Sequence, residues 1–170
     1  MWIVEIVDTA LDHRLDRHGI EPRDVDGLDG IVAAPFLHVG FGHLVANTIP
    51  FVFMGAVIAF EGPLRLVAVT AIVALISGLG TWLVAPEGTI HVGASGVVFG
   101  YATYLIARGW FNRRFGEIGI GLALAVLWGG ALLAGLEPRE GISWQGHLFG
   151  ALGGIAAAAM LARPPRRDVT

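Results

Sequence analysis

The chain of 170 residues contains no cysteine and no lysine, and charged side chains make up only 15% of it. Without cysteine, the sequence excludes a disulfide scaffold, a zinc site with cysteine ligands and a thiol nucleophile. The 11 basic residues are all arginine, the formal net charge is −3, and no basic run is interleaved with aromatic side chains. A nucleic-acid partner is therefore not expected.

The few charges that are present leave long apolar stretches between them. Hydrophobic residues make up 55% of the chain, and the mean hydropathy is +0.69. Five stretches contain no Asp, Glu, Lys or Arg: 30–60, 66–86, 88–107, 118–136 and 141–162. Each reaches the length of about 18–25 residues that a helix needs to cross about 30 Å of hydrocarbon. The sequence therefore predicts an all-α polytopic membrane helix bundle.

Five full transmembrane helices are expected, after a shorter first helix. They are predicted at about 42–60, 63–85, 93–107, 116–136 and 143–162. Residues 1–11 are apolar but too short to span, and they form either the end of a truncated first span or a helix in the membrane interface. They lack a basic n-region and a cleavage site, so no signal peptide is predicted. The domain expected for 1–170 consists of a partial first helix, an external first loop that is irregular or re-entrant beyond residue 30, helices two to six and a tail: 1–11, 12–42, 43–162 and 163–170.

The arginines predict the orientation, because cytoplasmic loops are enriched in basic residues. Three of the predicted connections carry most of them: Arg65, then Arg108, Arg113 and Arg114, then Arg163, Arg166 and Arg167. The opposite loops at 86–92 and 137–142 contain only Arg139. We expect a multi-pass protein of the cell membrane with a cytoplasmic C-terminus and an external acidic loop at 12–29.

Polar side chains inside spans are costly and mark function by default. Three clusters are predicted at one depth near the external side: His38 to His43 and Asn47, Gly93-Ala94-Ser95-Gly96, and Gln145-Gly146-His147. A serine hydroxyl becomes a nucleophile when a base, most often histidine, lies beside it. Ser95 and His147 can meet only if their helices pack closely, which small residues permit. Such faces are present: Gly96 and Gly100 on one helix, and Gly146, Gly150 and Gly154 on the other.

The remaining polar pair could stabilise developing charge. His43 and Asn47 are four residues apart, so they share a helix face and could donate hydrogen bonds to an oxyanion. No acidic residue lies in the helices of Ser95 and His147, and Glu61 lies at the wrong end of its helix. A hydrolase built on these residues would use a Ser-His dyad and no triad.

The motifs HxxxxHxxxN, GxSG and GH, in this order on these helices, resemble the rhomboid family of intramembrane serine proteases over about residues 31–162. The resemblance implies that Ser95 is the nucleophile and His147 the general base and acid. It places His43 and Asn47 in the oxyanion hole with the Ser95 backbone N–H. The other positions that match are supporting ones, with Phe99 stacked on the histidine and His38 structural: Gly93, Gly96, Phe99, Gly146 and His38.

The same resemblance implies that the partners are single-span transmembrane proteins, as substrates, and the surrounding lipid bilayer. It also implies that no metal or organic cofactor is needed. The loop near 137–142 would cover the site. Two features depart from the family: the first helix is incomplete, and the tryptophan-arginine pair of the first loop is absent. Neither departure involves the dyad.

Other readings of the same residues remain. Ser95 could be a small packing residue, and His43 with His147 could hold a haem or a metal. The whole chain could be a non-catalytic rhomboid-like protein that binds or escorts membrane clients, or a transporter or channel. His91 and Gln145 are predicted as surface or cap residues, and His13 and His18 as solvated. The sequence does not predict the oligomeric state.

Overall fold

The computed structural model describes residues 1–162. In that part of the chain the regular structure is helical, and the β-pairing consists of one isolated bridge between Ile20 and His91. The five longer helices are α3 (Phe41–Ala59), α4 (Pro63–Val84), α5 (Ser95–Asn112), α6 (Phe115–Gly135) and α7 (Trp144–Met160). The shorter ones are α1 (Trp2–Ala10), η1 (Asp16–His18), η2 (Asp26–Leu28), α2 (Gly30–Ala33) and η3 (Ala34–Phe36).

Three helices, α3, α4 and α6, are long and apolar enough to cross a membrane. Their outward faces carry large apolar side chains, and Leu64 and Val126 are both 83% exposed. Exposure on this scale is unfavourable in water but suits contact with lipid. The α6 helix is the most peripheral of the three, because only 17% of its most apolar 18-residue stretch is buried, against 28% for α3 and 33% for α4.

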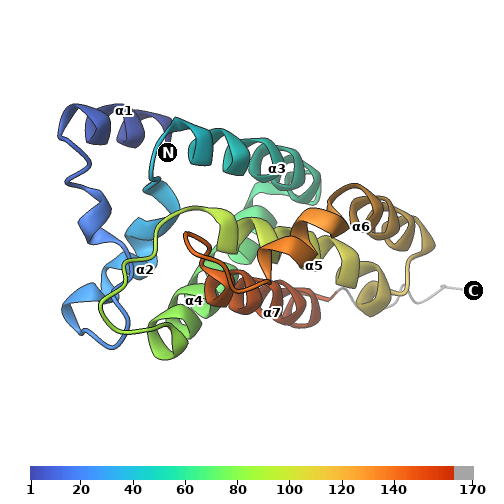
Figure 1. The fold of residues 1–170 in the computed structure, drawn as a ribbon. Coiled ribbons are helices and arrows are strands. Elements are labelled where there is room, and N and C mark those ends of the chain that lie inside the picture. The colour runs from blue at the N-terminus through green and yellow to red at the C-terminus, as the bar shows by residue number, and fades with distance from the viewer. Residues whose placement is uncertain (163–170) are drawn as a thin grey trace, which may run out of the picture.

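The centre of the bundle is formed by α5, which contacts α3, α4, α6 and α7 (Figure 1). Its buried side chains Tyr101, Tyr104 and Leu105 lie at the middle of the core. The α5 and α7 helices approach through glycines: a Cβ on Gly150 would clash with the Gly96 carbonyl oxygen. The small-residue faces therefore bring these two helices into backbone contact, as the sequence predicts.

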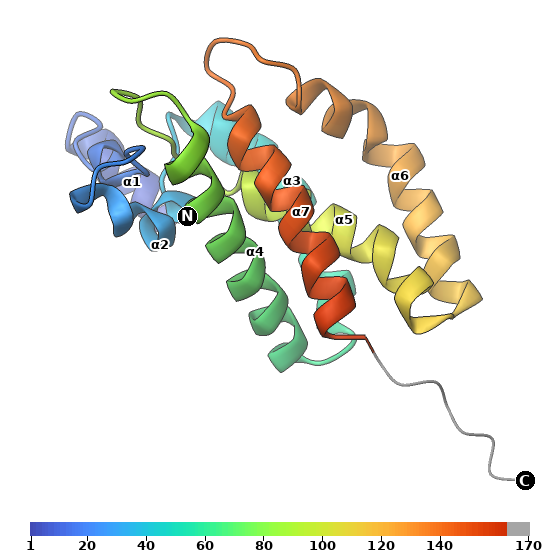
Figure 2. The ribbon, with the colours of Figure 1, turned by 90° about the horizontal axis from the view of Figure 1, so that it is seen from below.

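The connections lie at two opposite ends of the bundle (Figure 2). The loop from α4 to α5 and the loop from α6 to α7 lie at one end, and the links from α3 to α4 and from α5 to α6 lie at the other. Ser95 and His147 belong to the first turns that follow the two loops of the first end. The arrangement of the helices therefore gathers the motif residues at one end.

Two predicted segments differ from the structure. The helix expected to end at Ala107 continues to Asn112, because Arg108 is only 4% exposed and forms an ion pair with Glu61 inside the bundle. The first charge after the apolar stretch predicts the end of the helix there, whereas the ion pair with Glu61 allows Arg108 to lie within it. The stretch expected to be irregular after residue 30 instead forms the short helical turns α2 and η3. The predicted tail at 163–170 lies outside the described residues.

Candidate active site

Ser95 is the first residue of α5, directly after a tight bend in the chain. Gly93 has a φ of +117°, and a Cβ at this position would lie 2.6 Å from Cε1 of His43. Glycine therefore permits both the left-handed backbone and the approach of the histidine ring. The position of Ser95 matters electrostatically, because the first N–H groups of a helix have no partner within it and carry partial positive charge.

His147 lies in the first turns of α7, and its ring reaches Ser95. Nε2 of His147 lies 2.8 Å from Oγ of Ser95. The contact spans 52 residues of sequence and depends on the glycine packing of α5 against α7. The geometry suits transfer of the serine proton to the imidazole, because a general base must lie within about 2.6–3.2 Å of the group it deprotonates.

The other face of His147 is held by α5 and α6. Nδ1 lies 2.7 Å from the carbonyl oxygen of Gly135, the last residue of α6. Since a carbonyl can only accept, Nδ1 carries the hydrogen and Nε2 is left to accept from Ser95. The Phe99 ring stacks on the imidazole, with centroids 4.2 Å apart and planes 5° apart. Orientation of the ring thus comes from a backbone carbonyl and an aromatic face.

His43 and Asn47 belong to α3, and their side chains lie near Ser95 of α5. Both line the same cavity as Ser95 and His147, a space of about 860 Å³. The Asn47 side chain is only 5% exposed, and its amide nitrogen donates to the His43 carbonyl at 3.1 Å. Because an amide nitrogen carries two hydrogens, one remains for another acceptor. The structure therefore gathers four polar side chains around one space.

His38 supports this group from the loop before α3. It is fully buried, and its ring lies edge-on to that of His43 at a centroid distance of 5.1 Å. Burial, and next the neighbouring His43, lower the pKa of His38 to about 4. The imidazole is consequently neutral near pH 7 and acts as an uncharged aromatic support.

The walls of the cavity include residues that were expected at the surface. Gln145 is only 5% exposed, so its prediction as a surface or cap residue is wrong. His91 is half-buried, and its Nδ1 lies 2.7 Å from Oγ of Ser143. This bond joins the loop from α4 to α5 with the loop from α6 to α7, and burial lowers the pKa of His91. Both residues are drawn inward because the two loops close over the same space.

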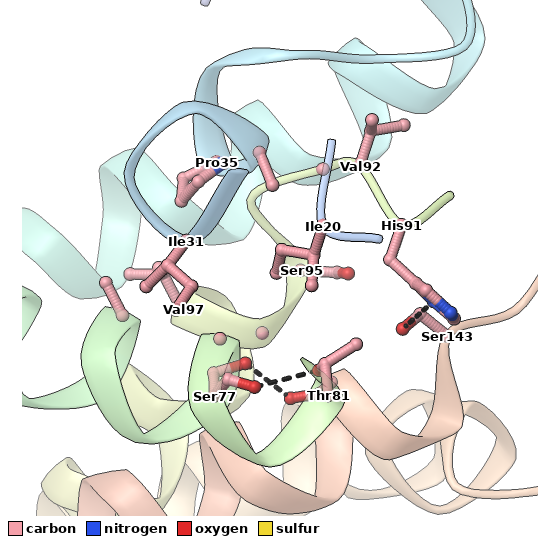
Figure 3. Close-up of a pocket in the computed structure, with 16 residues that line it drawn as sticks. Ile20, Ile31, Pro35, Ser77, Thr81, His91, Val92, Ser95, Val97 and Ser143 are labelled. Atoms are coloured by element: carbon pink, nitrogen blue, oxygen red, sulfur yellow. Dashed lines mark hydrogen bonds between the residues drawn. The ribbon is translucent and has the colours of Figure 1, made fainter. Parts of the chain in front are cut away.

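A smaller cavity of about 40 Å³ lies on the side of Ser95 that faces α4 (Figure 3). Two hydroxyl groups of α4 stand there: Ser77 donates to the Gly146 carbonyl at 2.8 Å, and Thr81 donates to the Ser77 carbonyl at 2.8 Å. The Ser77 bond fixes the first turn of α7, one residue before His147. The sequence analysis missed Ser77, although a polar residue within a span is a signal for it.

Comparison with known sequences gives the family of the chain. The sequence profile described as Rhomboid domain matches residues 27–164. Uncharacterized proteins of Mycobacterium tuberculosis and Mycobacterium leprae are 42% identical over 98% of the chain, which covers 73% and 69% of their respective lengths. A Bacillus subtilis protein named "Putative rhomboid protease YdcA" is 29% identical over 81% of the chain and 69% of its own length. The chain therefore belongs to the rhomboid family.

Proposed function

We propose that this rhomboid protein is an intramembrane serine endopeptidase that cleaves single-span membrane proteins. The observation that carries the proposal is the 2.8 Å contact between Ser95 Oγ and His147 Nε2. The hydrogen bond from His147 to Gly135 supports it, because that bond leaves Nε2 as the acceptor of the serine proton. A packing serine needs no such partner.

In the first step, Ser95 Oγ attacks the scissile carbonyl carbon while its proton moves to Nε2 of His147. The carbonyl π electrons move to oxygen and give a tetrahedral oxyanion. The amide of Asn47, the ring of His43 and the N–H of Ser95 stabilise that charge. All three residues line one cavity, and the Ser95 N–H lies at the start of α5, which supports this role.

In the second step, Nε2–H of His147 protonates the leaving amine nitrogen as the C–N bond breaks, and an acyl-enzyme remains on Ser95. Water then attacks the ester carbonyl, with its proton taken by His147, and Ser95 leaves with that proton. The carbonyl of Gly135 stabilises the imidazolium formed in both steps. The reaction needs no metal or organic cofactor.

The architecture proposed for this activity has α3 to α7 as five spans, with α1 as the short first helix and the C-terminus in the cytoplasm of the cell. A substrate helix unwinds near the external side and enters between α3 and α6. The Phe53 ring of α3 lies against the Trp128 ring of α6, with centroids 5.2 Å apart. Entry along this path requires these two rings to separate.

The test is cleavage of a single-span reporter in liposomes, together with labelling by a fluorophosphonate, which reacts with activated serines. Wild type is expected to cleave the reporter and to take up one label per chain. Ser95→Ala should abolish the label and lower cleavage by at least about 10³-fold. His147→Ala should lose both activities as well, because the hydroxyl then has no base.

Ser143→Ala is the matched control for the label. Ser143 lies in the same cavity, but its hydroxyl bonds His91 and makes no contact with His147 that would activate it. Ser143→Ala should still take up one fluorophosphonate label per chain. A label that follows Ser143, or cleavage that survives Ser95→Ala, would contradict the proposal. Binding of the reporter without cleavage or labelling would favour a client-binding rhomboid-like protein instead.

A further inference from the structure

A second group of ionisable side chains lies away from the candidate active site, where α1 meets the first loop. Asp8 is near the end of α1, Asp16 opens η1, and His13 lies in the turn between them. Nδ1 of His13 lies 3.6 Å from Oδ2 of Asp8 and 3.9 Å from Oδ2 of Asp16. One ligand atom from each residue lies within 4.8 Å of the others.

The charges in this group are not balanced by the described chain. The Asp8 side chain is 1% exposed, and its Oδ1 accepts the Leu15 N–H at 2.6 Å, whereas Oδ2 has no hydrogen-bond partner among residues 1–162. Glu5, one turn earlier on α1, is also 1% exposed, and neither of its carboxylate oxygens has a hydrogen-bond partner there. A buried carboxylate oxygen without a hydrogen-bond partner is strongly unfavourable unless a positive charge compensates it.

Glu5 lies next to this group, three residues before Asp8 on the buried face of α1. Within the described residues, the only basic group at ion-pair distance from these carboxylates is His13. Three carboxylates therefore lie beside a single imidazole.

We propose that Asp8, His13 and Asp16 bind a divalent transition-metal cation, with Zn²⁺ as the best match, and leave the fourth position of the zinc to water. Zinc accepts imidazole nitrogen together with carboxylate oxygen and prefers four ligands. A histidine in the set argues against Ca²⁺ and Mg²⁺, which select oxygen ligands. The cation offsets the charge of the carboxylates, including that of the neighbouring Glu5, and gives the unpartnered Oδ2 of Asp8 a ligand bond.

The position of this site gives the cation a structural effect beyond charge. Its ligands join α1 to η1, and the chain reaches Ile20 four residues after Asp16. Ile20 exchanges two backbone hydrogen bonds with His91, at 2.9 and 3.0 Å, and His91 bonds Ser143 beside the candidate active site. A bound cation therefore fixes the first loop against the wall of the cavity, while the Ser95–His147 contact itself involves none of the ligands.

The test measures metal binding and stability on the full chain without a histidine tag, in detergent, and it does not depend on proteolysis. After treatment with EDTA and its removal, we expect one Zn²⁺ per chain by calorimetry and by elemental analysis, and no binding of Mg²⁺. At a hundredfold excess of Zn²⁺ over Kd, the Tm should rise by roughly 5–10 °C. The double variant His13→Gln, Asp16→Asn should lose the stoichiometric site and the shift in Tm.

Asp16→Asn alone should change the Tm in opposite directions in EDTA and in Zn²⁺. In EDTA its Tm should equal or exceed that of wild type, because one repelling charge is gone; in Zn²⁺ wild type should be the more stable. His18→Gln and Asp26→Asn, which change exposed residues of the same loop, are the matched controls and should bind Zn²⁺ as wild type does. Absence of a one-to-one site in wild type, or binding that survives the double variant, would overturn the proposal.

Discussion

The imidazole of His147 is fixed on three sides by groups from two other helices. Ser95 and Phe99 come from α5, one at its edge and one on its face, and the Gly135 carbonyl comes from α6. A carboxylate would be needed if the ring were free to rotate or to choose its tautomer. With stacking and a carbonyl acceptor both in place, a dyad can keep the ring oriented without an acidic residue.

At the residue scale, the proposed oxyanion hole can be tested through Asn47. Replacing it by alanine removes an N–H donor without touching the dyad, so kcat should fall by about 10²–10³-fold. Asn47→Asp keeps the shape of the side chain but turns the donor into a negatively charged acceptor, and it should be at least as slow. The measurement is the rate of reporter cleavage at saturating substrate.

Thr48→Ala serves as the control for Asn47. Thr48 is the next residue on α3, and its hydroxyl donates to the Leu44 carbonyl without lining the cavity. Its kcat should stay within a few-fold of wild type. If Asn47→Ala cleaved as fast as Thr48→Ala, the oxyanion would have to be stabilised by His43 and backbone N–H groups alone.

At the element scale, the end of α6 contributes to the site through its backbone. The last carbonyl groups of a helix have no partner within it and carry partial negative charge. Gly135 directs one of them at Nδ1 of His147, where it stabilises the ring most when the ring is protonated. The close approach requires glycine, because a Cβ there would lie 2.6 Å from Cζ of Phe99 and 3.0 Å from Nδ1 of His147.

Gly135→Ala should therefore impair catalysis more than stability. The added methyl group pushes α6 away from the Phe99 and His147 rings, which weakens the hydrogen bond to the carbonyl and misaligns Nε2. Overpacking of this kind costs about 1–3 kcal/mol of folding free energy, and we expect kcat to fall by at least about tenfold. Cleavage rate and thermal unfolding measured on the same preparation check both expectations.

Gly130→Ala is the control on the same helix. A Cβ at Gly130 meets no atom within 4 Å, so the change adds a methyl group in open space. Alanine favours a helix over glycine by about 1 kcal/mol, so this variant should be as stable as wild type or more so, with unchanged kcat. Equal rates in both variants would show that the α6 carbonyl does not orient His147.

The sequence predicted the helices and the meeting of the motifs better than the contacts that depend on other segments. Helices α3, α4 and α6 were predicted within about two residues, because uncharged runs and glycine or proline boundaries mark them. The approach of Ser95 and His147 was predicted from the common depth of their motifs, and the glycines of both helices permit it. The Gly135 carbonyl could not be predicted, since a backbone acceptor has no side chain that signals it. The inward position of Gln145 and the continuation of α5 through Arg108 depend on partners in other segments, which spacing alone does not identify.

At the scale of the whole molecule, charge separates the two ends of the bundle. The end opposite the candidate active site carries Arg65 in the first turn of α4, and Arg113 and Arg114 in the link between α5 and α6. In the two loops around the site, the one arginine is Arg139, which is paired with Glu137. The first loop adds arginines at the site end, but one of them, Arg23, is paired with Glu87 at 2.8 Å, and acidic residues outnumber arginines there. This asymmetry favours a bundle with the site at the external end.

The absence of cysteine makes this orientation directly testable, because any introduced thiol is the only one in the chain. Glu140→Cys lies in the exposed loop between α6 and α7, and Gly116→Cys lies at the start of α6, where a Cβ meets no atom within 4 Å. In intact cells, a membrane-impermeant maleimide should label Glu140→Cys and spare Gly116→Cys until the cells are opened. Unmodified protein sets the background. The reverse pattern would place Ser95 and His147 near the cytoplasm, and substrates would then have to be cut at that side of the membrane.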